Sequence, residues 1–158
     1  MAMAKAMVSW AEFAAAAPDM AAQGRRLIHP RDHGEAFLAT VRGEGALRIH
    51  PISVGIVDDG LFAFIIKKSA KHADLMTDGR YALHSHVDPA APSEFSVRGR
   101  AELASRETRD AVAPGWSFDV DDDYDLFEFG VEHAVLGVRD DPDEWPPRYT
   151  SWASGRRG

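Results

Sequence analysis

Short apolar segments separated by turn residues fill the chain between residues 36 and 103, and this pattern limits the fold more than any other feature. The segments are too short for core helices and are rich in β-branched and aromatic residues, which favour strands. In Phe95–Leu103, apolar or small residues alternate strictly with polar ones and so occupy one face of a strand. Asp58–Gly60 has the composition of a tight hairpin turn. The sequence therefore predicts an antiparallel sheet that closes into a small barrel.

The expected architecture is mainly β: a six-stranded antiparallel split barrel with one short helix inside the strand series and further helices at its flanks. Pro51 lies inside an expected strand and cannot donate a ladder hydrogen bond, so it must occupy a bulge or a sheet edge. Gly130 is expected to form a bulge within one long strand. We expect strand structure at residues 37–41, 46–57, 61–66, 81–87, 95–103, 126–138 and 148–152, the last of them at an edge.

Four helix starts can be recognised from their capping residues. Ser9 is followed three residues later by Glu12, which is the spacing of a capping box. Pro18 suits the first turn of a second helix, while Ser69 and Ser105 are good caps for two later helices. The expected units are an N-terminal helical extension at residues 1–34, a split β-barrel domain at residues 35–152 and a flexible tail at residues 153–158.

Composition narrows the possible partners. The 158 residues include 18 basic and 25 acidic ones, and the net charge of −7 disfavours nonspecific binding to nucleic acid or to anionic lipid. There is no cysteine, which excludes disulfides, a thiolate nucleophile and cysteine-type metal sites. No apolar stretch is long enough for a membrane helix, and the start lacks a secretory layout. We expect a cytoplasmic protein with no nucleic-acid or membrane partner.

Three of the four lysines fall within five residues, at Lys67, Lys68 and Lys71, where an apolar strand runs into a helix capped by Ser69. The unpaired N–H groups at a helix N-terminus carry positive potential and attract anions. The lysines add charge, and the Ser69 hydroxyl adds a donor. The segment indicates either a phosphate-binding corner or a solvent-exposed basic turn.

The segment from Arg48 to Ser53 is the second unusual feature. Alternation places Arg48 and His50 on one face of a strand and Pro51 and Ser53 on the other, so polar residues occur on both faces. Pro51 would open the ladder and leave neighbouring backbone groups free for a ligand. The alternative is an irregular edge strand on which Arg48 and His50 are simply exposed.

Six short motifs follow one another in order along the chain. They are Phe37-Leu38-Ala39-Thr40-Val41, Arg48-x-His50-Pro51, the Asp58–Gly60 turn, Ser69-x-Lys71 before Asp78-x-Arg80, Val97-Arg98-Gly99-Arg100-Ala101, and Trp145-Pro146-Pro147-Arg148-Tyr149-Thr150-x-Trp152. Their order and spacing strongly resemble the pyridoxamine 5'-phosphate oxidase-like superfamily of split β-barrels. The resemblance covers roughly residues 35–152.

This resemblance implies an FMN-binding homodimer, with the flavin in a groove between the subunits and hydride or electron transfer to or from a small-molecule redox substrate or electron donor. It implies that Arg48 reaches the phosphate or ribityl chain and that Phe64 and Ile65 offer main-chain contacts to the isoalloxazine edge. Ser69 and Lys71 would bind the phosphate. Further cofactor-binding residues are expected at His50, Pro51, Ser53, Lys68, Arg148 and Trp152.

The chain also departs from the pyridoxal-forming enzymes. It has Ser53 where they have a basic residue, and Ala70 where they have arginine, which argues against pyridoxamine phosphate as substrate. Alternative cofactors of the same fold are the 8-hydroxy-5-deazaflavin coenzyme and haem, and a flavin-binding or sensing dimer without turnover is a third reading. The sequence nominates no catalytic acid or base. His84 and His86 share a strand face but are expected to be ordinary polar residues, with no metal site.

Overall fold

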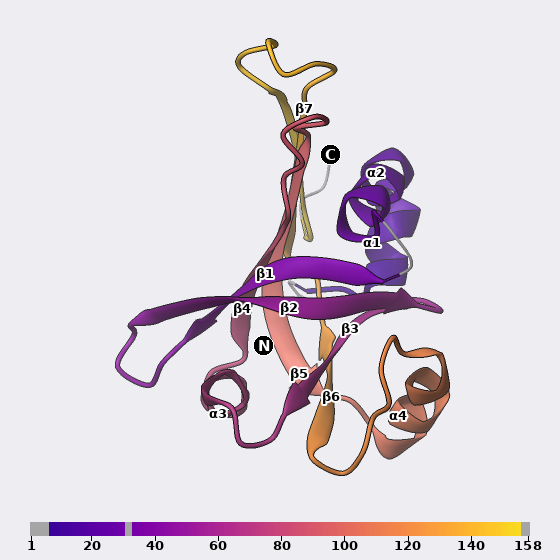
Figure 1. Ribbon diagram of the computed structural model, residues 1–158, viewed down its shortest axis with the longest axis vertical. Helices are drawn as coiled ribbons and strands as arrows, with labels where there is room; N and C mark the ends of the chain where they lie inside the picture. Colours follow the sequence, from indigo (N-terminus) through magenta and orange to yellow (C-terminus); the bar gives the residue numbers. More distant parts are fainter. Residues whose placement is uncertain (1–6, 31–32, 156–158) are drawn as a thin grey trace.

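Eight strands and four α-helices make up the described part of the chain, residues 7–30 and 33–155, in the computed structural model (Figure 1). The strands are β1 (Gly34–Val41), β2 (Leu47–Val57), β3 (Gly60–Ile66), β4 (Arg80–Ser85), β5 (Glu94–Leu103), β6 (Tyr124–Phe129), β7 (His133–Val138) and β8 (Arg148–Ala153). The helices are α1 (Trp10–Ala16), α2 (Pro18–Ile28), α3 (Ala70–Thr77) and α4 (Arg106–Val112), and a 3₁₀ turn, η1 (Ala113–Gly115), follows α4. Among these described residues, no helix is long and apolar enough to cross a membrane.

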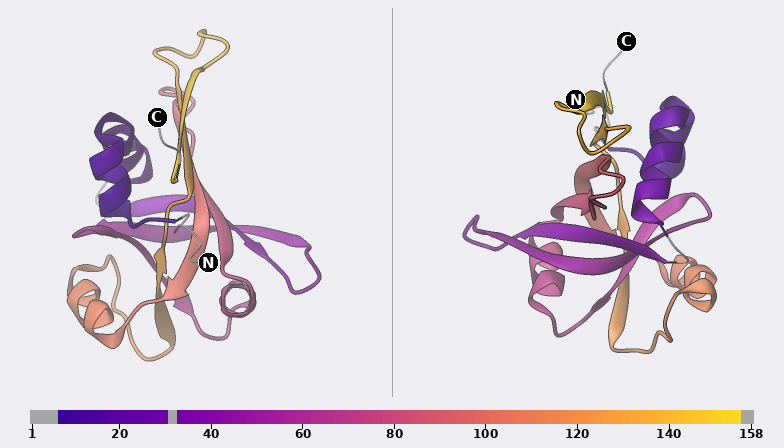
Figure 2. Two further views of the ribbon diagram at one scale, coloured as in Figure 1. Left: turned by 180° about the vertical axis from the view of Figure 1, so that it is seen from behind. Right: turned by 45° about the horizontal axis from the view of Figure 1, so that its top comes forward.

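The strands form one antiparallel sheet in the order β4-β1-β2-β3-β6-β5-β7-β8, and β4 also pairs with β5. This additional pairing closes β1 to β6 into a barrel and leaves β7 and β8 outside it as a two-stranded arm, with β8 at the edge. Figure 2 shows from two further directions that the arm projects from the barrel. The expected six-stranded antiparallel split barrel is therefore confirmed, with two strands added to it.

The expected helix starts are confirmed by their capping bonds. The Ser9 hydroxyl accepts from the Glu12 N–H, and the Glu12 carboxylate accepts from the Ser9 N–H, which completes the capping box of α1. Pro18 occupies the first turn of α2, and the hydroxyls of Ser69 and Ser105 cap α3 and α4. Three parts of the expected terminal extension and tail, residues 1–6, 31–32 and 156–158, lie outside the described residues.

The expectation of one strand over residues 126–138 is wrong. β6 and β7 are separate strands because they pair with different parts of β5: β6 with its last three residues and β7 with residues 94–98. Between them, the N–H groups of Gly130 and Glu132 donate to the carbonyls of Arg100 and Arg98. The chain crosses Gly99 so closely that a Cβ atom there would collide with the Gly130 carbonyl. This crossing separates the barrel from the arm.

The N-terminal helices share the barrel's hydrophobic core. Phe13 of α1 is fully buried, and its ring centroid lies 6.4 Å from that of Phe95 in β5. Gly24 of α2 lies directly on the same Phe95 ring, where a Cβ atom would clash. α3 lies on the opposite side of the barrel from α1 and α2 (Figure 1). Apolar side chains thus pack between the barrel and the α1–α2 pair. The α3 side instead carries charged residues, among them Asp74 and Lys71 of α3 and Arg48, which contacts Asp74.

Ile56 of β2 lies opposite Leu61 of β3, and its main-chain N–H and carbonyl are bound by two side chains from the end of α2. The Ile56 N–H donates to Nε2 of His29 over 3.1 Å, and its carbonyl accepts from the Arg25 guanidinium over 3.3 Å. Burial lowers the pKa of His29, and the charges of Arg25 and His33 lower it further. The folded protein therefore holds His29 as the neutral imidazole that can accept this bond.

We predict that the free energy of unfolding falls as the pH drops below about 6.5, because unfolded His29 takes up a proton that folded His29 resists. His29→Gln should reduce this slope in urea unfolding between about pH 7 and pH 5. The slope should diminish rather than vanish, since the pKa of His50 is lowered too. An unchanged slope would contradict the assignment.

Candidate functional site

β2 and β3 separate soon after the hairpin that joins them. They pair at only three positions, from Gly55 opposite Phe62 to Val57 opposite Gly60. Residues 47–54 of β2 pair with β1 alone, among the described strands. Over this stretch each strand has one open main-chain edge, and the two edges face the same split. Pro51 lies on this open stretch, which confirms that it occupies a sheet edge.

Strand alternation identifies the β2 groups that face the split. The N–H and carbonyl of Ile56 are bound by the end of α2, on the side of β2 that faces β1. Successive residues of a strand direct their main-chain groups to opposite sides. Pro51 and Ser53 therefore direct theirs toward the split.

The same reasoning applies to β3. The Lys67 N–H donates to the Asp123 carbonyl at the start of β6 over 2.8 Å. Ile65 consequently directs its main-chain groups toward β6, while Phe64 directs its groups toward the split. Of the two main-chain contacts expected from β3, Phe64 lies at the open edge and Ile65 lies in the ladder.

Arg48 is held in place by a buried carboxylate on α3. Its Nε donates to Oδ2 of Asp74 over 2.8 Å, and the Thr40 hydroxyl of β1 donates to the same oxygen over 2.8 Å. Asp74 is only 7% exposed. Burial raises the pKa of Asp74, but the hydrogen bonds from Arg48 and Thr40 outweigh it and hold the pKa below its ordinary value. Asp74 is therefore ionised, and three elements meet at one oxygen atom.

His50, two residues beyond Arg48 on the same face of β2, has an unsatisfied ring nitrogen. Its Nε2 is buried and makes no hydrogen bond to any described residue. Burial lowers the pKa of His50, and the charges of Lys71 and Arg48 lower it further. Buried polar groups normally have partners, and leaving one unpaired costs free energy. The His50 face of β2 is thus an incomplete surface that a ligand can complete.

The Ser69 hydroxyl is engaged by the cap of α3. It accepts from the His72 N–H over 3.3 Å and donates to the Ile66 carbonyl over 2.7 Å. Its proton is therefore directed at β3 rather than at the space in front of the helix. The backbone N–H groups of the first turn are the donors that remain there.

The lysines at this corner differ in their surroundings. Asp125 of β6 lies 2.7 Å from Nε2 of His72 and 4.0 Å from Nζ of Lys67. Lys68 and Lys71 have no carboxylate within ion-pair distance in the described part of the chain. The corner therefore keeps positive charge after its internal pairing, and the Lys71 charge contributes to lowering the pKa of His50.

Two expected site residues lie apart from this corner in the single chain. Arg148 pairs with Asp140 and Glu144 in the arm, and the tip of the arm lies at the opposite end of the molecule from α3 (Figure 1). Trp152 packs on Phe13, with ring centroids 5.0 Å apart. The structure thus brings together Arg48, His50, Lys71 and the start of α3, but not Arg148 or Trp152.

His84 in β4 and His86, just beyond the end of that strand, also have local partners. His84 Nδ1 lies 2.6 Å from the Ser85 carbonyl. His86 Nδ1 lies 3.4 Å from Glu35, whose other oxygen is 2.8 Å from His33. His86 also stacks on Phe37, with ring centroids 4.4 Å apart. In the described residues no group of three or more potential ligands forms a metal site.

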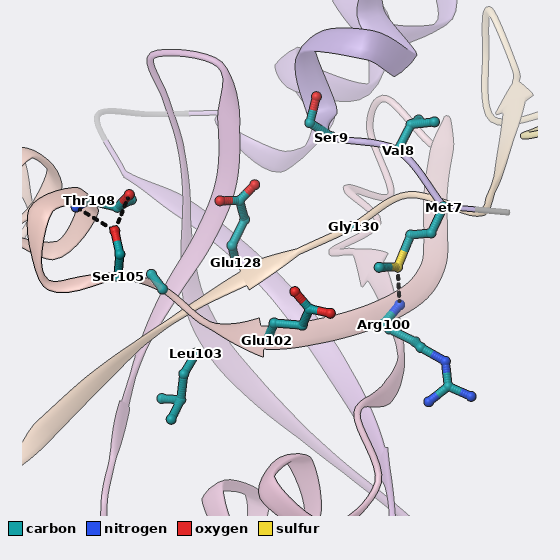
Figure 3. A pocket seen from close by; sticks show the side chains of 11 residues that line it. Met7, Val8, Ser9, Arg100, Glu102, Leu103, Ser105, Thr108, Glu128 and Gly130 are labelled. Carbon is teal, nitrogen blue, oxygen red and sulfur yellow. Dashed lines mark hydrogen bonds between the residues drawn. The ribbon is translucent and has the colours of Figure 1, made fainter. Parts of the chain in front are cut away.

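A separate cavity of about 310 Å³ lies between β5, β6 and the start of α4 (Figure 3). Glu102 and Glu128, which are opposite each other in the β5–β6 ladder, point into it. The Arg100 guanidinium points away from it. Two carboxylates make this lining unsuitable for a phosphate.

Sequence reasoning missed Asp74 and Asp125, the two carboxylates that organise the corner. Asp74 meets Arg48 across 26 positions of sequence, and Asp125 meets His72 across 53. Neither contact has a local motif. The one available signal is that Asp74 follows Lys71 by three residues on an expected helix, which places both on one face.

No protein-family model matches the sequence, and no curated protein is significantly similar to it. Solved structures share its fold at low identity. A haem-binding protein from Mycobacterium smegmatis superposes with a TM-score of 0.59 at 17% identity, covering 82% of this chain and 57% of that protein. A pyridoxamine 5'-phosphate oxidase-like protein from Listeria innocua gives 0.58 at 12% identity, covering 73% and 95%. PhzG from Burkholderia lata, in complex with tetrahydrophenazine-1-carboxylic acid, gives 0.56 at 13% identity, covering 91% and 93%.

These likenesses establish the fold. The chain has the split-barrel architecture of the pyridoxamine 5'-phosphate oxidase-like proteins, as its motifs predicted. It spans less than two thirds of the length of the mycobacterial haem-binding protein.

Breaking the Arg48–Asp74 pair should destabilise the fold more than removing both partners. We predict that Asp74→Leu lowers the free energy of unfolding by about 2–4 kcal/mol, because it leaves Arg48 and Thr40 without their shared acceptor. The double variant Arg48→Met, Asp74→Leu should recover part of this loss. Urea unfolding of the two single variants and the double variant measures the coupling. Strictly additive costs would contradict the pairing.

Proposed function

We propose that the protein binds FMN in the split between β2 and β3 and acts as a flavin-dependent oxidoreductase of the pyridoxamine 5'-phosphate oxidase-like type. One observation carries the proposal: two open main-chain edges end at a basic corner that contains an unsatisfied imidazole nitrogen. A ligand that suits this arrangement has a planar ring with polar atoms at its edge and an anionic end.

The residues present fit FMN. The main-chain groups of Phe64 and Ser53 face the split and suit the hydrogen-bonding edge of an isoalloxazine ring. Arg48, Lys68 and Lys71 suit a terminal phosphate, which carries nearly two negative charges. The His50 nitrogen would gain a partner. Bound FMN would supply the hydride or electron transfer, and the protein would orient it and tune its potential.

We also propose that the functional unit is a homodimer. The outer face of β1 and β2 carries an apolar patch in which Phe37 lies opposite Pro51 and Ala39 lies opposite Ile49. Ile49 is 69% exposed and Leu47 is 78% exposed. Contiguous exposed apolar residues of this kind mark interaction surfaces, and a two-fold axis through the patch would pair it with itself. The projecting arm would then extend toward the partner's flavin with Arg148, while Trp152 stays packed on Phe13.

Haem is the second candidate ligand. The mycobacterial protein with this fold is a haem-binding protein, and the unsatisfied His50 nitrogen is a potential iron ligand. The 8-hydroxy-5-deazaflavin coenzyme is a third planar ligand for the same split. Titration of the apoprotein with each ligand in turn should show the largest rise in melting temperature with FMN.

Reduction of the bound flavin tests catalysis separately from binding. A reduced nicotinamide donor should bleach the flavin, and a defined electron acceptor should restore its visible absorbance over many cycles. Binding without this cycle would favour the flavin-binding or sensing dimer without turnover.

We predict that Lys71→Ala weakens FMN binding by about tenfold or more, because it removes a cation without a carboxylate partner from the phosphate corner. Fluorescence titration of the apoprotein measures the dissociation constant. Arg106→Ala on α4 is the matched control and should leave the affinity unchanged. A wild-type protein that stays colourless and ignores added FMN would refute the proposed function.

We predict that Ile49→Asp converts the dimer to a monomer, because it places a charge in the centre of an apolar interface. Sedimentation velocity should show the mass falling from twice the 17.3 kDa chain mass to that of one chain. Met76 is 53% exposed outside the patch, so Met76→Asp should leave the dimer intact. Monomeric wild-type protein would contradict the interface.

A further inference from the structure

We propose that Asp74 is the positioning residue for Arg48, which it holds so that the free edge of the guanidinium can grip a phosphomonoester. This inference rests on the proposed binding of FMN at the corner. Arg48 uses only its Nε for Asp74, and its two terminal amino groups make no hydrogen bond to any described residue. The Arg48 side chain remains 30% exposed.

The direction of the Arg48–Asp74 contact matters for anion recognition. A guanidinium is a rigid planar fork, and two parallel N–H groups on one edge match two oxygens of a phosphate. A carboxylate that took the two terminal groups would compete with such a ligand. Asp74 instead binds at Nε through a single oxygen, Oδ2. The pair therefore fixes the plane of the guanidinium without consuming the edge that a phosphate needs.

Thr40 fixes the carboxylate in turn. Its hydroxyl donates to the same Oδ2 over 2.8 Å, and Thr40 itself is fully buried in β1. The orientation of Arg48 is thus set by a relay from β1 through α3 to β2. Stability alone does not account for this relay, because well-packed apolar residues of similar volume are often as stable as a buried ion pair. Preorganising the free edge of Arg48 is a function that apolar residues cannot supply.

α3 supplies a second cation, Lys71, in addition to Arg48. Lys71 lies one turn before Asp74 on the same helix, and its charge is felt by His50, two residues beyond Arg48. Arg48 and Lys71 therefore act on the same space from β2 and from α3. Two cations suit a terminal phosphate with nearly two negative charges better than a phosphodiester with one.

Removing the Asp74 charge would have two opposing effects on an anionic ligand. Without the negative charge of Asp74, the anion is repelled less and should bind more tightly. Without the hydrogen bond from Asp74, however, Arg48 is no longer held in place, which should weaken binding. Substitutions that keep the charge separate these effects. Asp74→Glu displaces the carboxylate, and Thr40→Val removes the hydroxyl that orients it with little change of volume.

The decisive quantity is the ratio of the dissociation constants of riboflavin and FMN, since the two ligands differ only in the phosphate. We expect this ratio to fall by about tenfold in Asp74→Glu and by about threefold in Thr40→Val, while riboflavin affinity stays constant. Thr77→Val, at an exposed site at the end of α3, is the matched control and should keep the wild-type ratio. Melting curves establish that each variant is folded.

The outcomes distinguish this inference from the proposed function. A wild-type ratio in folded Thr40→Val and Asp74→Glu overturns the positioning role and leaves FMN binding in place. If the wild type binds neither flavin, the proposed function fails. Titration with inorganic phosphate alone then tests whether Asp74 positions Arg48 for a phosphate. A phosphate-induced rise in melting temperature that is lost in Thr40→Val then supports the positioning role. No rise in the wild type overturns it.

Discussion

The early separation of β2 from β3 is the constraint on which the candidate site depends. Because only three residue pairs hold the two strands together, β2 follows β1 and β3 follows β6. The barrel still closes because β4 pairs with both β1 and β5. Open main-chain edges are costly unless something covers them, and α3 begins where β3 ends. The open edge of β3 therefore ends at the start of α3, beside the lysines at residues 67, 68 and 71.

Charge at the corner is organised locally rather than by the protein as a whole. The chain carries a net charge of −7, so its general field repels anions. At the start of α3, Arg48 and Lys67 each lie beside a carboxylate, Asp74 and Asp125, whereas Lys68 and Lys71 have none within ion-pair distance among the described residues. Asp74 and Asp125 each bind the cation or imidazole beside them, which fixes the direction of these groups. The fixed orientation of these groups would therefore select an anionic ligand by the positions of its oxygens, as well as by its charge.

Local signals in the sequence predicted local structure well. The Ser9–Glu12 capping box, the Ser69 cap and the alternation of Phe95–Leu103 depend on neighbouring residues, and all three formed as expected, except that Leu103 at the end of β5 is 46% exposed. The division of residues 126–138 into two strands was missed because it depends on which part of β5 each half meets. Asp74 was missed for a similar reason, since its partners Arg48 and Thr40 come from other strands. The packing of Trp152 on Phe13 joins the two ends of the chain, which no local pattern reveals.

A crystal structure of the protein grown with FMN is the most direct measurement of ligand placement. The phosphate should lie at the start of α3, within hydrogen-bond distance of the terminal amino groups of Arg48, with the ring edge against the open main chain of Phe64. His50 Nε2 should have a partner. A flavin bound between Glu102 and Glu128, or a split closed by β2 and β3 pairing along their length, would contradict the assignment.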